Sequence, residues 1–256
     1  MIFDVNAFIG RWPYWPIEST TGAELCSLLS EWDIQQAAVC STRSLFVNWE
    51  DGNIETESEI AACGGALVPM ACLGPRELSH KFSGEPHDFD AYAARGFRGV
   101  RLYPQHHSYH PLYEASIEPI LEDAAQRGWP VMLPLRVVMN WGVPMLDIGV
   151  MAAVIERHPK VNWILAGINY LFELQMAISM MRRFDCVHLE TSCIMGFEAI
   201  AKIVQQVGSE RLLFGSGSPI QNGAAVVAKI AHANISETAR EAIFYTNARR
   251  LFNLKS

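Results

Sequence analysis

Short apolar runs alternate with longer segments of helical periodicity along the whole chain. Eight runs rich in β-branched and aromatic residues recur at intervals of roughly thirty residues, the length of one βα unit. They lie at residues 1–8, 34–41, 66–73, 97–103, 130–137, 161–167, 186–192 and 211–216. The pattern predicts eight strands, each followed by a helical crossover, because parallel strands must be joined by such a connection.

The segments between the runs carry helix start and stop signals. A T-x-x-E capping box occupies 21–24 and precedes an apolar stripe. A second stripe, 117–125, is followed by Gly128, a residue type favoured just after a helix end. The helix that begins near 148 must stop before Pro159, and Ser236 is placed to cap the last helix.

Eight strands alternating with helices predict a (β/α)₈ barrel that forms a single domain over residues 1–256. An open doubly wound sheet is the alternative. No glycine-rich phosphate loop follows the first run, which disfavours the nucleotide-binding form of that sheet. In a barrel, working residues lie at the carboxyl ends of the strands and in the loops that follow them.

The composition and charge of the chain limit the kinds of binding partner and the cellular compartment that we expect. The formal net charge is −7 and the sequence has no basic tract, so nucleic acid and anionic membranes are not expected partners. The N-terminus carries an early acid and no basic region, and no long apolar run occurs, so we expect a cytoplasmic protein. The 6 cysteines form no C-x-x-C pair and are expected to be reduced.

Several segments, taken in order, resemble the amidohydrolase-related family of metal-dependent hydrolases and decarboxylases. The resemblance runs nearly end to end and is carried by FDVNAFIG, GFRGVRLYP, RGWPVMLPL, WILAGINY, HLETS, ERLLFGSGSP and TNARRLFNL. It implies a (β/α)₈ barrel. It also implies a hydrolase or lyase that acts on a small molecule.

The resemblance further implies one or two divalent metals, which this chain lacks the residues to hold. The family takes its ligands from an H-x-H on strand one, histidines on strands five and six, and an aspartate on strand eight. The corresponding positions here are Asn6, Phe8, Pro134, Gly167 and Gly217. Because a catalytic zinc needs about three ligands from His, Cys, Asp or Glu, we expect no metal and no other cofactor.

Period-two alternation selects other side chains that share the interior face of the predicted strands. Arg101 and Tyr103 share a face on strand four, and Arg136 and Asn169 follow the interior positions of strands five and six. With Trp12, these are the candidate substrate-binding residues, since a guanidinium suits a carboxylate. The alternative for each arginine is an internal ion pair with Asp4, Glu190 or Glu173.

His188 and Glu190 share a face on strand seven and are the candidate catalytic pair. The alternative is that they satisfy backbone groups or an arginine inside a polar barrel. Cys193 is expected to be a small core residue rather than a nucleophile, and Ser216 and Ser218 are expected to be turn serines.

Three histidines, His106, His107 and His110, follow strand four. The spacing of His106 and His110 would suit a metal in a helix, but the residues between them favour a loop with solvated histidines.

The aromatic stretch RWPYWPIE, 11–18, is expected either to cover the barrel mouth or to form a contact between subunits of a homo-oligomer. These features lead to two functional hypotheses. One is a metal-independent hydrolase or lyase acting on a small carboxylated cyclic or aromatic molecule. The other is an inactive barrel that binds a small molecule or serves as an assembly subunit.

Overall fold

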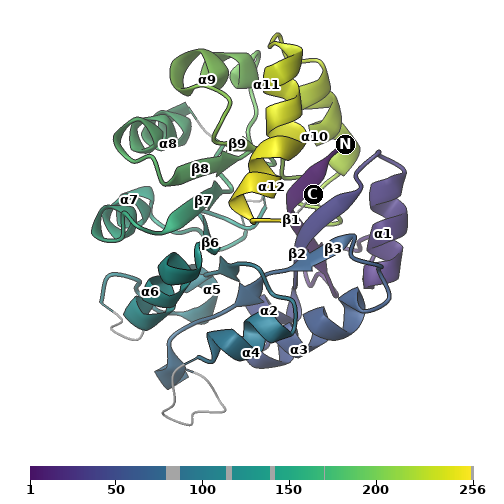
Figure 1. Ribbon diagram of the computed structural model, residues 1–256, viewed down its shortest axis with the longest axis vertical. Helices are drawn as coiled ribbons and strands as arrows, with labels where there is room; N and C mark the ends of the chain where they lie inside the picture. Colours follow the sequence, from purple (N-terminus) through teal and green to yellow (C-terminus); the bar gives the residue numbers. More distant parts are fainter. Residues whose placement is uncertain (79–86, 114–116, 139–141, 170, 255–256) are drawn as a thin grey trace.

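A closed barrel of parallel strands, surrounded by helices, is the architecture of the protein (Figure 1). The computed structural model describes residues 1–78, 87–113, 117–138, 142–169 and 171–254. The strand segments are β1 (Phe3–Ile9), β2 (Gln36–Ser41), β3 (Leu67–Pro69), β4 (Ala71–Cys72), β5 (Val100–Arg101), β6 (Pro130–Pro134), β7 (Asn162–Ala166), β8 (Val187–Glu190) and β9 (Leu212–Leu213). Each of the eight apolar runs predicted as strands overlaps one of these segments or, for 66–73, two, and β1 extends one residue beyond the first run.

Two sets of backbone hydrogen bonds turn the segments into one barrel. Segments β3 and β4 are one strand interrupted at Met70, whose N–H donates to Val39 O (2.9 Å), while Ala71 N–H donates to Gly99 O (2.8 Å). The first and last strands are joined by Val5 N–H to Phe214 O (2.9 Å) and by Gly217 N–H to Asn6 O (2.8 Å). The closed barrel is therefore confirmed over the open sheet.

Helices cover the outside of the barrel (Figure 1). They are α1 (Gly22–Ser30), α2 (Arg43–Phe46), α3 (Trp49–Ile60), α4 (Phe89–Ala94), α5 (Pro104–His107), α6 (Ile117–Arg127), α7 (Ile148–Arg157), α8 (Leu171–Arg183), α9 (Ala199–Val207), α10 (Gly223–Ala231), α11 (Glu237–Glu241) and α12 (Asn247–Leu251). A 3₁₀ turn (Arg76–Leu78) precedes α4, and a π-helical turn (Ala242–Thr246) joins α11 to α12.

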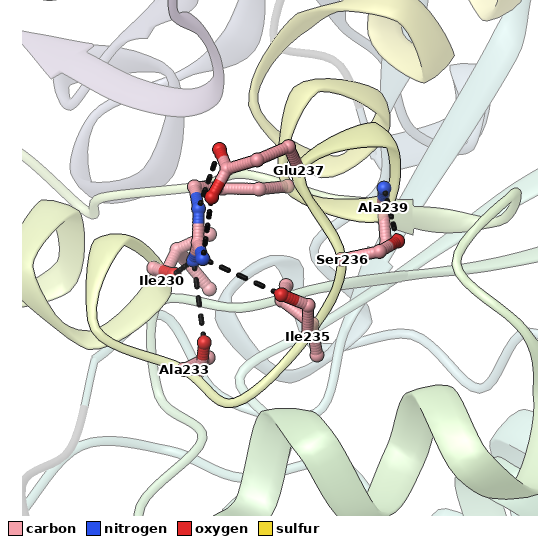
Figure 2. Close-up of polar contacts among 7 residues, drawn as sticks. Ile230, Ala233, Ile235, Ser236, Glu237 and Ala239 are labelled. Carbon is pink, nitrogen blue, oxygen red and sulfur yellow. Dashed lines mark hydrogen bonds and ion pairs between the residues drawn. The ribbon is translucent and has the colours of Figure 1, made fainter.

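The predicted helix signals are present in the structure. The capping box at Thr21 forms in full, and Gly128 adopts φ 65°, a conformation open to glycine after a helix. The Ser236 hydroxyl accepts from Ala239 N–H at 3.2 Å and caps α11, as Figure 2 shows. The Arg240 guanidinium donates to Ile230 O (2.8 Å), which closes the end of α10.

The barrel interior has three layers along its axis. An apolar floor contains Phe3, Met132 and Leu213, and Phe252 after α12 packs on Phe3 with ring centroids 5.4 Å apart. A second apolar cluster at the opposite, carboxyl-terminal end contains Phe8 and Trp12, among others. Polar side chains lie between the two clusters, and they form the site described below.

A bulge in β1 changes which side chains face the interior. The register with β2 shifts between Asp4 and Ala7. Phe3 and Val5 face the floor below the bulge, whereas above it Phe8 contributes to the upper cluster and Asn6 contacts an interior arginine. A single alternating pattern along β1 could not place all four side chains inside.

The 6 cysteines are unpaired thiols, as the sequence predicts. Within the described ranges, the structure contains no helix with the length and apolar character needed to cross a bilayer.

Candidate functional site at the carboxyl ends of the strands

Arg101 on β5 places its guanidinium in the polar layer of the barrel. The side chain is completely buried. Its Nη2 donates to the backbone carbonyls of Ala38 (2.8 Å), Ala7 (3.3 Å) and Val5 (3.4 Å). Its Nη1 donates to Asn6 Oδ1 at 3.2 Å, and its Cζ lies 5.0 Å from the centroid of the Phe8 ring. Arg101 therefore links β1, β2 and β5 from inside.

Tyr103 lies directly above this guanidinium. Its hydroxyl accepts from Arg101 Nη1 at 3.5 Å and lies 3.7 Å from Cys40 Sγ. Burial raises the pKa of the Tyr103 hydroxyl well above its usual value, so the phenol is neutral. Arg101 and Tyr103, which were expected to bind substrate, thus satisfy each other inside the protein.

Arg136 follows β6 and forms a bidentate ion pair with Glu173 on α8. Nη1 donates to Oε2 at 2.9 Å and Nη2 to Oε1 at 2.5 Å, and both side chains are buried. The Asn169 N–H donates to the same carboxylate at 2.9 Å. Of the two alternatives for Arg136, the structure has the internal ion pair with Glu173. Glu173 thus holds the two candidate residues Arg136 and Asn169 together. It also neutralises the Arg136 charge that was expected to bind a ligand.

Glu190, at the end of β8, is a completely buried carboxyl group. It accepts from Ser192 N–H and Ser192 Oγ, each at 2.7 Å, and from Gly167 N–H at 3.1 Å. Burial raises its pKa, although the hydrogen bonds from Ser192 and Gly167 oppose the shift. Gly215 makes room for this carboxyl, because a Cβ at 215 would overlap Glu190 Oε2 and lie 3.1 Å from Asn6 Cβ.

His188 lies on the same strand face two residues below Glu190, toward the floor of the barrel. Its Nδ1 is 3.3 Å from Trp163 O, and its charged neighbours are Arg211 and Arg250. Burial lowers its pKa to about 4, so the ring is neutral near pH 7. In the described residues, no hydrogen bond joins His188 to Glu190. The expected acid–base pair is therefore not assembled.

Asp4 forms a third polar group with the loop after β9. Its carboxylate accepts from Ser216 N–H at 2.9 Å and from the Ser216 hydroxyl, which lies 2.6 Å from Ser218 Oγ. Burial raises the Asp4 pKa, and the Ser216 hydrogen bonds and the Arg101 charge oppose that rise. Both serines act in the turn, as expected, and they tie the first strand to the last.

The positions at which the family holds its metal do not fit an ion in this chain. Asn6 already accepts from Arg101, and Phe8 offers no donor atom. Gly167 adopts φ 71°, and a Cβ there would lie 2.8 Å from Arg136 N and closer still to Arg136 O, so a histidine could not stand there without moving that backbone. A Cβ at Gly217 would overlap the Gln221 amide. In the described residues, no three His, Cys, Asp or Glu side chains form a group able to bind a metal.

The Gln221 side-chain amide, which occupies the space beside Gly217, also contacts Cys193. Gln221 Nε2 lies 3.6 Å from Cys193 Sγ. Burial and the nearby Glu190 raise the pKa of this thiol to about 11, which agrees with the expected core role and not with a nucleophile.

The first-strand loop and α2 form an aromatic cluster over the barrel mouth. Trp12 is buried, and its ring packs within 5.3 to 5.4 Å of Tyr14, Trp15 and Phe46. The Trp12 indole N–H has no hydrogen-bond acceptor in the described part of the chain. Both roles expected of this stretch, covering the barrel mouth and forming a subunit contact, stay predictions.

The histidines after β5 differ from the expected solvated loop. Pro104–His107 forms helix α5, and Ser108 at φ 57° ends it, so His106 and His110 do not share a helix. His106 packs edge-on against Phe46, with centroids 5.6 Å apart, and burial lowers its pKa to about 4. His107 is also largely enclosed, and only His110 is exposed. The prediction of solvation is wrong for the first two because the aromatic cluster extends over them.

A hollow lies beside this cluster, between the loops that follow β1 and β2. Its volume is about 520 Å³. Its lining contains Arg11, which is exposed and has no ion-pair partner in the described residues, and Arg43, which lies 3.6 Å from Asp51. The remaining lining residues are Gly10, Pro13, Thr20, Thr21, Thr42, Phe46, Val47, Glu55 and Glu59.

The two acids of the hollow are already engaged. Glu55 accepts from Ser41 Oγ at 2.8 Å and Glu59 accepts from Gly22 N–H at 2.8 Å. Arg43 and Phe46 are not among the candidate residues predicted from the sequence, because α2 lies outside the eight predicted βα cores. Their position directly after the second strand is the signal that could have identified them.

Comparison with known proteins identifies the family. The sequence profile described as "Amidohydrolase" matches residues 87–254, more than half of the chain. The chain belongs to the amidohydrolase family. No curated protein sequence matches it.

Three solved structures show the same barrel as this amidohydrolase-family chain. A 2,6-dihydroxybenzoate decarboxylase complexed with 2,6-dihydroxybenzoate is 15% identical, with 99% of both chains covered and a TM-score of 0.74. A 5-carboxyvanillate decarboxylase from Sphingomonas paucimobilis is 12% identical, with 99% of both covered and a TM-score of 0.73. A dihydroxybenzoic acid decarboxylase from Polaromonas sp. JS666, with bound manganese and the inhibitor 2-nitroresorcinol, is 15% identical, with 99% of this chain and 97% of that chain covered and a TM-score of 0.72. At these identities the likeness shows the fold.

Replacing Glu173 with alanine should strongly destabilise the protein, since it removes the carboxylate that both Nη atoms of Arg136 contact. Breaking a buried pair in this way typically costs about 3–5 kcal/mol. Urea unfolding of Glu173→Ala measures the loss. The control is Glu156→Ala, which breaks a surface pair with Arg183 whose side chains are 55% and 66% exposed, and should cost less than about 1 kcal/mol. Equal losses would contradict the structural role of the buried pair.

The neutral His188 should make stability depend on pH. Its folded pKa of about 4 lies below the usual value of 6.5, so its contribution is present above pH 6.5 and is lost as pH falls toward 4. At pH 5 that loss amounts to about 2 kcal/mol. His188→Asn keeps a donor for Trp163 O but does not titrate, so its unfolding free energy should fall less than that of the wild type between pH 7 and 5. Asp4 and Glu190 have raised pKa values and act in the opposite direction in both proteins. Parallel pH profiles would refute the assignment.

Proposed function

We propose that this protein is a metal-independent member of the amidohydrolase family that binds a small carboxylated ring compound at the barrel rim. The observation that carries the proposal is the hollow of about 520 Å³ between the loops after β1 and β2, whose lining includes both Arg11 and Phe46. This is the carboxyl-terminal face of the barrel, where barrel proteins bind their ligands.

The metal-independent part of the proposal rests on what fills the family's ligand positions. Arg101 engages Asn6 and Phe8, the Arg136 backbone excludes a side chain at Gly167, and Gln221 occupies the space beside Gly217. A bound divalent ion would supply a nucleophilic hydroxide, and its chemistry requires ligands that these residues do not provide. No step of the proposed function passes through such an ion.

The choice of ligand rests on the chemistry of the rim. The sequence suggested that Arg101 and Arg136 bind the carboxylate. Because Arg101 is completely buried and Arg136 is paired with Glu173, we assign this role to Arg11 instead. A guanidinium near solvent can hold a carboxylate through two parallel hydrogen bonds. Phe46, which lines the hollow and packs on the buried indole of Trp12, offers its ring to a ring compound. Similar structures include one with 2,6-dihydroxybenzoate bound, which makes that compound a suitable probe.

Binding of 2,6-dihydroxybenzoate should depend on the charge of Arg11. Isothermal titration calorimetry on protein treated with a chelator should detect binding, and 2,6-dihydroxybenzamide, which lacks the charge, should bind more weakly. Arg11→Gln should weaken binding of the acid about tenfold, the value of one charge-assisted hydrogen bond of about 1.4 kcal/mol, and leave the amide nearly unchanged.

Arg182→Gln provides the matched control for that experiment. It removes the same charge from an exposed position on α8, where Arg182 donates to Gln206. Its affinities should equal those of the wild type. If neither ring compound binds, or if the acid binds only after manganese is added, the proposed function is wrong.

Acid catalysis by Glu190 is a second candidate function. A carboxyl group with a raised pKa at the carboxyl end of a barrel strand has the properties of a general acid. Gly215 leaves room for this carboxyl group, because a Cβ at 215 would overlap Glu190 Oε2. In this case the ring compound would have to reach the interior, and Glu190 would deliver a proton to it.

Glu190→Gln tests this second candidate. In a screen of carboxylated aromatic compounds for release of carbon dioxide, the variant should lose activity by about 10²–10⁴-fold. Glu210→Gln, which removes a charge before β9, serves as the control. Activity that survives in the Glu190 variant, with the far-ultraviolet circular dichroism unchanged, would eliminate Glu190 as the acid.

A further inference from the structure

We infer that the Arg101 guanidinium is a permanent internal cation that takes the place of the family's metal ion. The inference rests on the metal-independent part of the proposed function and explains how the barrel centre retains a positive charge. It concerns the interior, whereas the proposed ligand binds at the rim.

The guanidinium contacts Asn6 and Phe8 of β1. It donates to Asn6 Oδ1 at 3.2 Å, and its Cζ lies 5.0 Å from the Phe8 ring centroid. These two side chains stand where the family has the H-x-H of its first strand. The guanidinium therefore contacts both first-strand positions from which the family holds its ion.

The donors of the guanidinium are surrounded by hydrogen-bond acceptors. An arginine side chain is always charged in proteins and presents five N–H donors. Here Nη2 contacts three carbonyl oxygens, Nη1 contacts Asn6 and the Tyr103 hydroxyl, and Nε lies 3.4 Å from Met70 Sδ. No carboxylate of the described residues forms an ion pair with it, so oxygen dipoles surround the charge as they would surround a metal ion.

The buried Asp4 carboxyl group interacts electrostatically with the guanidinium, whose charge opposes the rise of the Asp4 pKa. The charged group that acts on Glu190 in the same way is Lys229. Arg101 thus favours the charged form of Asp4 without a metal. The loss of the metal ligands at positions 6 and 8 and the enclosure of Arg101 are therefore parts of one arrangement.

Cobalt binding tests whether the guanidinium itself blocks the site. The double variant Asn6→His/Phe8→His places imidazoles at the two first-strand positions, and it should still bind no Co²⁺ because Arg101 remains. Adding Arg101→Ala should produce one equivalent of bound Co²⁺, seen by its visible absorption, with at least tenfold higher affinity than the double variant. Arg101→Ala alone should bind none.

Three results would overturn the inference. One is a double variant that binds Co²⁺ as tightly as the triple variant. The second is a folded triple variant that binds none. The third is binding by Arg101→Ala alone at the affinity of the triple variant. If the alanine variants do not fold, Arg101→Gln, which keeps a side-chain donor without the charge, replaces them in the same comparison.

Crystals of the unaltered protein grown with MnCl₂ provide a measurement that needs no variant. Arg101 density between Asn6 and Phe8, with no anomalous peak there, supports the inference, whereas a manganese ion bonded to the Asn6 side chain overturns it. The rim proposal is judged separately, because 2,6-dihydroxybenzoate binding depends on Arg11 and not on Arg101.

Discussion

The rest of the barrel depends on a single charge enclosed at its centre. Removing a guanidinium from water costs several kcal/mol, and the protein offsets this cost only if every N–H finds an acceptor. Arg101 meets that condition through the backbone carbonyls of two other strands, the Asn6 amide, the Tyr103 hydroxyl and the Met70 sulfur. Strands that are distant in sequence must therefore keep their relative positions for Arg101 to remain satisfied.

The bulge in β1 makes this arrangement geometrically feasible. Without the extra residue, Val5 and Asn6 would point to opposite faces of the strand, and the floor and the polar layer could not both be supplied by β1. The bulge lets Phe3 close the floor while Asn6 and Phe8 meet the guanidinium. The glycine at 215 then leaves room for the Glu190 carboxyl beside Asn6.

The sequence was sufficient to predict features determined by local pattern. The eight strands, the capping box at Thr21 and the cap at Ser236 follow from neighbouring residues and are confirmed. Alternation also placed His188 and Glu190 on one face, but it could not give their depth. His188 contacts residues near the floor, whereas Glu190 reaches the loop after β7. Which acid pairs with Arg136 depends on a helix contact 37 residues away, which no local pattern encodes.

In the proposed function, a barrel whose centre is filled by its own cation binds its ligand at the rim. The aromatic cluster of Trp12, Tyr14 and Phe46 closes over the interior, and the accessible guanidinium of Arg11 lies outside that cluster. An exposed arginine can exchange water for a carboxylate at little desolvation cost, whereas the buried one would first have to give up its carbonyl partners. Burial thus separates the two arginines: Arg101 is held by its internal acceptors, whereas Arg11 is the one that the proposed function assigns to a carboxylate.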